Sequence, residues 1–103
     1  MPIRKPYKVV YSGSFNVDVE AVTFYIARNL RNPNAAIKLL DKIIAAVNKR
    51  SCNPDSFEKF ILPNGCPIFR IYIGNYVVYY TLEDDVMVLN RFLYGKRDIA
   101  DIL

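Results

Sequence analysis

Apolar side chains recur at helical spacing in the first half of the chain. Between residues 15 and 30 the apolar positions are three or four residues apart, which predicts one amphipathic helix. Ser14 is suited to cap its start, and Asp18 and Glu20 near the first turn suit the positive end of the helix dipole. The expected core positions of this helix are Phe15, Val19, Val22, Ile26 and Leu30.

Asn32 and Pro33 predict that the first helix stops and a second one starts. Proline fits the first turn of a helix because it lacks the N–H group that would be unpaired there, and asparagine is a good cap. So short a connection predicts an antiparallel helical hairpin. The expected apolar face of the second helix is Ala36, Leu40, Ile43 and Val47, widened by Leu39 and Ile44.

After residue 67 the period of the apolar pattern changes to two, which is typical of strands. Residues 68–73, 76–82 and 86–93 are predicted to form three consecutive antiparallel strands. Gly74-Asn75 fits a two-residue hairpin turn with glycine first, and Glu83-Asp84-Asp85 provides the next turn.

Two further segments complete the pattern. Residues 7–11 are rich in β-branched and aromatic side chains and predict a first strand that ends at Ser12-Gly13. Residues 51–67 are interrupted by prolines and a glycine, so they are predicted to be a loop. The aromatic residues of Phe57 to Phe60 are expected to dock this loop on the core.

The predicted element order is therefore β-α-α-β-β-β, in the α+β class. Because each helix has an apolar stripe that a sheet face must cover, the hairpin is expected to pack on one face of a mostly antiparallel four-stranded sheet, in two layers. A chain of 103 residues has room for one hydrophobic core, so residues 1–103 are expected to form a single domain.

Composition excludes several kinds of chemistry. The chain has no histidine, which excludes histidine metal sites, Ser-His-Asp or Cys-His catalysis, and imidazole acid–base chemistry. Cys52 and Cys66 are too few and too far apart for a zinc site; they are expected to be idle thiols, with a loop-closing disulfide as the alternative. No apolar run is long enough to span a bilayer and no targeting signal is present, so we expect a cytoplasmic protein without metal or cofactor.

The formal charge of +4 is unevenly distributed along the chain. Residues 1–50 hold nine basic and three acidic side chains, a net charge of +6, whereas residues 51–103 hold five basic and seven acidic ones, a net charge of −2. Two interpretations are open. The basic residues are either the solvated outer faces of the helices or a surface that meets an acidic partner or phosphates.

Basic side chains within the predicted sheet give a more specific candidate site. Arg70 lies in the middle of a strand, Arg91 lies in the last strand, and Lys96-Arg97 follow it. If they converge on the open face of the sheet beside tyrosines, the cations would neutralise phosphates and the rings would stack on unpaired bases, as RNA binding requires. The tyrosines concerned are Tyr72, Tyr79, Tyr80 and Tyr94.

The alternative is that these residues are structural. In that interpretation Arg70 pairs with Asp98 or another carboxylate, and the tyrosines belong to the core. Glu58 and Lys59 are the loop residues that would join a site on the sheet. Arginine can stabilise a phosphorane-like charge and tyrosine or lysine can move protons, so RNA cleavage without a metal is chemically accessible to this set.

The most distinctive segment is the end of the chain, where the apolar strand Val88 to Leu93 runs into a small basic corner, Tyr94 to Asp98. Other segments that belong with it are Tyr7 to Tyr11, Asn32-Pro33 with Ala35-Ala36, Phe69-Arg70-Ile71, and Gly74 to Tyr80. Over nearly its whole length the chain thus resembles the RelE/ParE superfamily of toxins from type II toxin–antitoxin systems.

The resemblance implies a small cytoplasmic bacterial toxin that a cognate antitoxin holds inactive. The RelE-like branch of this superfamily cleaves mRNA on the ribosome, with basic residues on the sheet face and a tyrosine or histidine near the C-terminus. The ParE-like branch poisons DNA gyrase. Lys59, Arg70, Arg91, Tyr94, Lys96 and Arg97 are the candidates for contact with the target or nucleic acid, and Arg70, Arg91, Lys96 and Arg97 would be catalytic in a ribonuclease.

Departures from the ribonuclease pattern favour the ParE-like branch. Val77 follows Tyr76 where that branch usually has an arginine, and the chain closes on Ile102-Leu103 where it places a tyrosine or histidine; Arg97 does match a basic position of the branch. Loss of such an arginine would remove a few kcal/mol of transition-state stabilisation. The sequence therefore predicts a gyrase-directed toxin, with a ribosome-dependent mRNA endoribonuclease as the runner-up and an inactive toxin-fold relic as the third hypothesis.

Overall fold

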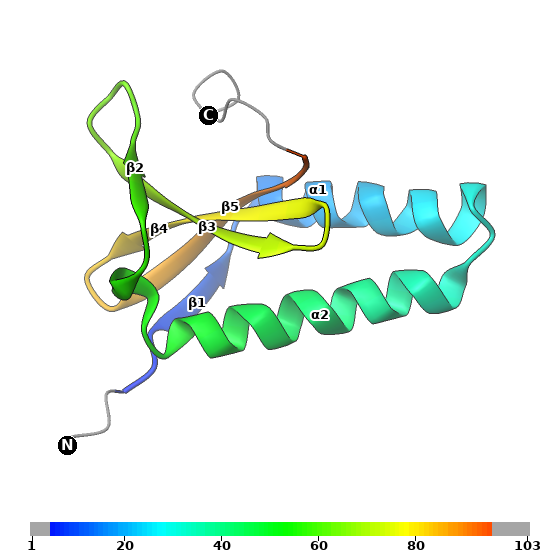
Figure 1. Ribbon diagram of the computed structural model, residues 1–103, viewed down its shortest axis with the longest axis horizontal. Coiled ribbons are helices and arrows are strands. Elements are labelled where there is room, and N and C mark those ends of the chain that lie inside the picture. The colour runs from blue at the N-terminus through cyan, green and yellow to red at the C-terminus, as the bar shows by residue number, and fades with distance from the viewer. Residues whose placement is uncertain (1–4, 96–103) are drawn as a thin grey trace.

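Residues 5–95 are described by the computed structural model, which has an α+β fold in two layers. Helix α1 (Gly13–Phe24) and helix α2 (Pro33–Ser51) run side by side in opposite directions and cover one face of a mixed sheet (Figure 1). The predicted class, the helical hairpin and its position on one face of the sheet are confirmed.

Within residues 5–95 the sheet has five strands, whereas four were predicted. Its strands are β1 (Lys8–Tyr11), β2 (Lys59–Ile61), β3 (Pro67–Ile73), β4 (Tyr76–Glu83) and β5 (Val86–Tyr94), and their spatial order is β1-β5-β4-β3-β2. Strand β1 pairs with β5 in parallel, whereas the other three pairings are antiparallel.

The additional strand β2 lies in the segment that was predicted to be a loop. Its three residues pair with β3, Lys59 opposite Phe69 and Ile61 opposite Pro67, and so form one edge of the sheet. A strand of three residues between proline-rich segments is too short to show a period of two, so the apolar pattern could not reveal it. The ring of Phe60 packs against the sheet, as expected for this loop.

Strand β1 passes into helix α1 without an intervening loop. The Ser12 backbone N–H donates to the Leu89 carbonyl over 3.0 Å, which extends the pairing with β5, while the Ser12 hydroxyl accepts from the Phe15 backbone N–H over 3.1 Å and caps the helix. The predicted cap, Ser14, is wrong, because the helix already begins at Gly13.

The two helices are joined where the sequence predicted. Helix α1 continues into a π-helical turn, η1 (Tyr25–Asn29), and Arg31 with φ of 50° then reverses the chain. Asn32 caps α2 through its side-chain oxygen, which accepts from the Ala35 N–H over 3.1 Å, and Pro33 occupies the first turn. A short 3-10 turn, η2 (Pro54–Ser56), follows α2.

The main hydrophobic core lies between the helices and the sheet. The apolar face of α2 is shifted from the prediction: Ile44 is 50% exposed at the rim, whereas Leu39 lies in the core. Leu30, expected in the core of the first helix, is 57% exposed because the chain has turned away at η1. The buried cluster is Phe15, Leu39, Ile43, Val47, Phe69, Ile71, Ile73, Val78, Tyr80, Met87, Leu89 and Phe92.

A second, smaller cluster lies on the opposite face of the sheet. It consists of Ile68, Val77, Tyr79 and Leu93, with Phe60 and Leu62 packed against it. Both faces of β3, β4 and β5 are therefore apolar at their centres, which explains why consecutive residues such as Val77 to Tyr80 are all buried.

The hairpin turns follow the predicted positions. Gly74 has a φ of 59° and Asn75 does not have a positive φ, as a two-residue turn with glycine first requires. Asp84, with a φ of 54°, occupies the corresponding position between β4 and β5. Cys52 and Cys66 are both free thiols. Within residues 5–95 no helix is long and apolar enough to cross a membrane.

Candidate functional site

The strand register places the two arginines of the sheet in one row. Arg70 of β3 lies opposite Tyr79 of β4, and Tyr79 lies opposite Arg91 of β5. Neighbouring strands are about 4.8 Å apart, so the two arginines are separated by one strand. The register thus places Arg70 and Arg91 in one row of the sheet, which is one element of the RNA-binding interpretation.

Arg91 is nevertheless engaged by a carboxylate of helix α1. Its Nε and Nη2 donate to the two oxygens of Asp18 over 2.6 and 3.0 Å, and the Phe92 backbone N–H donates to Asp18 Oδ2 over 3.0 Å. The last residue of β1, Tyr11, pairs with Leu89 of β5, so β1 does not extend alongside Arg91 and Phe92. Asp18 accepts hydrogen bonds from β5 along this part of its edge. The hydrogen bond to Asp18 raises the pKa of Arg91. Arg91 is therefore a link between helix and sheet.

Arg70 is held differently, by aromatic rings. Its guanidinium carbon lies 3.6 Å from the centre of the Phe60 ring and 5.4 Å from that of Tyr72, distances at which a cation is attracted to the ring face. Its Nε is buried, and no acceptor among residues 5–95 reaches it. The expected partner, Asp98, lies outside the described residues.

A second arginine, Arg50 at the end of α2, lies beside Arg70. Its guanidinium carbon is 3.5 Å from the centre of the Phe57 ring. Arg50 Nη1 donates to the Arg70 carbonyl and to the Tyr80 hydroxyl oxygen, both over 3.0 Å, and the Tyr80 hydroxyl donates to the Pro54 carbonyl over 2.8 Å. These bonds tie the end of α2 to β3, β4 and η2.

The two arginines and the aromatic rings around them enclose a hollow of about 210 Å³. We call it the cationic pocket. It is lined by Arg50, Phe57, Glu58, Phe60, Arg70 and Tyr72. A partly enclosed space with two guanidinium groups and exposed rings suits an anionic group attached to a flat or apolar one.

Burial raises the pKa of the Tyr80 hydroxyl, and the hydrogen bond from Arg50 opposes this effect without cancelling it. In the unfolded chain a tyrosine ionises near pH 10, whereas in the folded protein Tyr80 keeps its proton to higher pH. We expect the free energy of unfolding to fall as the pH rises past about 10. Urea denaturation of the wild type and of Tyr80→Phe between about pH 8 and 11 measures this effect; parallel pH dependences of the two proteins would contradict it.

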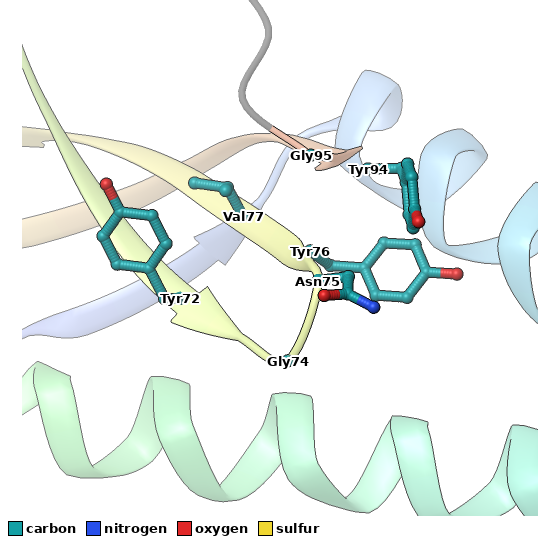
Figure 2. Close-up of a pocket in the computed structure, with 7 residues that line it drawn as sticks. All are labelled: Tyr72, Gly74, Asn75, Tyr76, Val77, Tyr94 and Gly95. Carbon is teal, nitrogen blue, oxygen red and sulfur yellow. The ribbon is translucent and has the colours of Figure 1, made fainter.

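A second hollow, of about 220 Å³, lies where the β3–β4 hairpin meets the end of β5. Figure 2 shows the rings of Tyr76 and Tyr94 next to each other at one end and Tyr72 at the other, beyond Val77. The centres of the Tyr76 and Tyr94 rings are 5.4 Å apart, edge to face. Burial, with smaller contributions from Tyr94 and Tyr25, raises the pKa of Tyr76. Tyr72 lines both hollows, so its ring lies between them.

The candidate residues from the sequence are thus only partly brought together. Arg70 lines the cationic pocket and Tyr94 lines the hairpin hollow. Lys59 is exposed on β2, where the alternation of side chains directs it to the face opposite Phe60. Tyr79 and Tyr80 are buried in the core, as the structural alternative predicted. Lys96 and Arg97 lie outside the described residues.

Three residues of the cationic pocket were not singled out as site residues from the sequence. In the sequence Arg50 is one of the basic residues at the end of the second predicted helix, and Phe57 and Phe60 are expected only to dock the loop on the core. The available signal was the recurrence of aromatic residues in a polar, proline-containing segment. Among the described residues, no group of three or more cysteine and carboxylate side chains is arranged to hold a metal ion.

A third hollow, of about 330 Å³, lies between the two helices and the end of β1. Leu40 and Ile44, which the shifted face of α2 leaves at the rim, form one wall, and Tyr11, Val19 and Thr23 contribute to the other. This groove is mostly apolar. It is an exposed hydrophobic surface, and none of the candidate site residues lines it.

One comparison with known proteins identifies a family, and another identifies a similar fold. The model of a family described as the ParE toxin of type II toxin–antitoxin systems, parDE, matches residues 9–99. A chromosomal ParDE toxin–antitoxin system from P. aeruginosa contains a chain of similar structure, with a TM-score of 0.72 at 11% sequence identity over 87% of this chain and 97% of that one. At this identity the likeness concerns the fold. A comparison with curated proteins gave no match.

Proposed function

Because the chain belongs to the ParE toxin family of type II toxin–antitoxin systems, we propose that it poisons DNA gyrase and does not cleave RNA. The match of the family's model to residues 9–99 is the observation that carries this proposal. The similarity of fold to a chain of a ParDE system supports the same assignment.

The geometry of the sheet supports a non-catalytic toxin. Metal-free RNA cleavage needs a positive group at the transferring phosphate and a side chain that moves protons. Where the ribonuclease branch usually carries an arginine, this chain has Val77, which is 3% exposed and packed in the smaller apolar cluster. Arg91 is neutralised by Asp18. Among the described candidate arginines, Arg70 therefore remains as the group that could contact a phosphate. Its guanidinium is stacked on Phe60.

Membership in this family implies a cognate antitoxin as partner. We propose that the antitoxin covers the apolar groove of the helical hairpin, where Leu40, Ile44 and Tyr11 are exposed. Gyrase and the antitoxin would both meet the toxin in the cytoplasm. The residues proposed to contact the target are Lys59, Arg70, Tyr94, Lys96 and Arg97, of which Lys96 and Arg97 form the most specific part of the sequence resemblance. Arg91 is a candidate from the sequence, but its pairing with Asp18 gives it a structural role.

A supercoiling assay tests the proposed function. Purified toxin added to gyrase, ATP and relaxed plasmid should prevent supercoiling, and prior addition of the cognate antitoxin should restore it. Arg97→Ala should weaken the inhibition, whereas Lys38→Ala, which removes an equal charge from an exposed position on α2, should not. Normal supercoiling at saturating toxin would rule out gyrase as the target.

The two other hypotheses give different results in the same set of experiments. Primer extension on translated mRNA after induction of the toxin would reveal cleavage sites if the chain is a ribosome-dependent endoribonuclease, and Arg97→Ala would remove them. Unimpaired growth during high expression without antitoxin would identify an inactive relic. We expect growth to stop without any mRNA cleavage.

A further inference from the structure

We propose that the cationic pocket binds a single carboxylate, the side chain of an aspartate or glutamate that a protein partner presents together with an apolar neighbour. This site does not depend on which target the toxin poisons. It is formed by the end of α2, the segment after η2, and strands β2 and β3.

Both guanidinium groups of the pocket are fixed before any ligand arrives. Arg50 and Arg70 each lie on a phenyl ring, 3.5 Å from the centre of Phe57 and 3.6 Å from the centre of Phe60. Stacking occupies the faces of these groups and leaves their edges, which carry the N–H donors. The planar arginine fork matches the two oxygens of a carboxylate. Because the side chains are already ordered, little conformational entropy is lost on binding.

The hydrogen bonds of Arg50 hold the two arginines together. Arg50 Nη1 donates to the backbone carbonyl of Arg70 and to the Tyr80 hydroxyl. The Tyr80 ring is fully buried, so the position of Arg50 is fixed by the core. Arg50 is thereby held against the backbone of Arg70, and the two arginines line the same pocket.

The orphaned Nε of Arg70 indicates that the site is incomplete. This atom is buried, and no acceptor in residues 5–95 contacts it. Glu58 lines the same pocket but forms no ion pair with Arg70 in the described part of the chain. A carboxylate from outside cannot touch this buried atom, but it can reach the rest of the guanidinium, because Arg70 as a whole is only partly buried. A partly buried charge without a carboxylate partner is unfavourable, so an anionic partner from outside is expected here.

The charge and the walls of the pocket favour a carboxylate on a peptide over a nucleic acid. The residues that line the pocket, two arginines and Glu58, have a net charge of +1, and the carboxylate of Asp55 also acts on Tyr80, the partner of Arg50. A single carboxylate can pair with one guanidinium group, whereas a chain of phosphates would be repelled by both acidic residues. The rings of Phe57 and Tyr72 are 46% and 56% exposed at the mouth. They provide an apolar surface for the residue next to the carboxylate.

Titration of the full-length protein with a defined peptide tests the proposal. The probe is Gly-Phe-Glu-Gly, acetylated and amidated so that the glutamate is its single charge, and its partner is Gly-Phe-Gln-Gly. In nitrogen-15 NMR spectra the glutamate peptide should shift the side-chain Nε–H signal of Arg70. It should bind roughly tenfold tighter than the glutamine peptide, because a charge-assisted hydrogen bond is lost in the latter.

Matched variants show whether the pocket itself binds the peptide. Arg70→Met should weaken binding about tenfold, and Phe57→Ala should weaken it severalfold by removing the support of Arg50. Phe57 is exposed, so its replacement provides a test even if Arg70→Met does not fold. Arg28→Met is the control, because Arg28 also lies over a ring, 5.1 Å from the centre of Phe24, but lines none of the hollows described above.

The proposal is overturned by any of three results. One is equal binding of the glutamate and glutamine peptides, and another is the absence of any shift at millimolar peptide. The third is that a hexauridylate RNA binds more tightly than the glutamate peptide with the same dependence on Arg70, which would assign the pocket to nucleic acid. None of these results changes the outcome expected in the supercoiling assay.

Discussion

Phe15→Ala should lower the free energy of unfolding by about 3–5 kcal/mol, the range for removal of a fully buried phenyl ring. Phe15 is 2% exposed and is the one fully buried side chain of helix α1. Its ring packs edge-on against Phe92, with 6.2 Å between ring centres, and lies 5.9 Å from the ring of Tyr11. Its removal would leave a cavity between α1 and the sheet.

Phe24→Ala is the matched control for this prediction. Phe24 lies on the same helix but is 49% exposed, so the same truncation removes much less buried area. We expect its effect to stay within about 1 kcal/mol. Urea denaturation followed by circular dichroism measures both variants. A domain of this size is stable by about 5–15 kcal/mol, so equal losses for the two variants would mean that α1 is not anchored through Phe15.

The sequence predicted the fold best where the residues that determine a structural feature are neighbours along the chain. The cap at Asn32, the turn at Gly74 and the alternation of the last three strands are local features, and the structure confirms them. Parallel pairing of β1 with β5 is not local, because it joins Lys8 to Val86 across the whole chain. Strand β2 forms only because β3 offers a free edge, and three residues cannot show a period.

The candidate site was harder to predict, for a related reason. Basic residues on a strand are visible in the sequence, but their partners are distant along the chain. Arg91 and Asp18 are 73 positions apart, and Arg50 and Arg70 are 20 apart. Asp18 was interpreted as a favourable charge near the helix start, whereas its three hydrogen bonds go to β5. Phe57 and Phe60 are visible in the sequence as aromatic residues of a loop, but no local pattern shows that they support Arg50 and Arg70.

The link between Asp18 and Arg91 leads to the second large prediction. Asp18→Asn keeps the shape of the side chain but removes its charge and one acceptor. In its better orientation the amide keeps its oxygen at the position of Oδ2, which accepts from Arg91 Nε and the Phe92 N–H, and turns its NH₂ group toward the donor Arg91 Nη2. Both side chains are largely buried, at 14% exposure for Asp18 and 22% for Arg91, so water does not fully replace the lost bonds. We expect a loss of about 2–3 kcal/mol in the free energy of unfolding, below the range for a fully buried pair.

Glu20→Gln is the control for Asp18→Asn, because it removes the same charge from an exposed position on the same helix. It should change stability by no more than about 0.5 kcal/mol. The loss in Asp18→Asn should persist at high salt, since the pair is only partly accessible to ions. Two results would contradict this prediction: an equal loss of stability in Glu20→Gln, or a loss in Asp18→Asn that disappears at high salt. Either would show that the loss arises from the overall charge of the helix.

Arg91→Met separates a structural role for Arg91 from a role in target binding. If Arg91 links α1 to β5, Arg91→Met and Asp18→Asn should destabilise the protein by similar amounts, and the double variant should lose little more than either alone, because both remove one interaction. Under conditions where Arg91→Met remains folded, it should then inhibit gyrase as the wild type does, while Arg97→Ala does not. Reduced inhibition by folded Arg91→Met with additive losses of stability would instead place Arg91 in contact with the target.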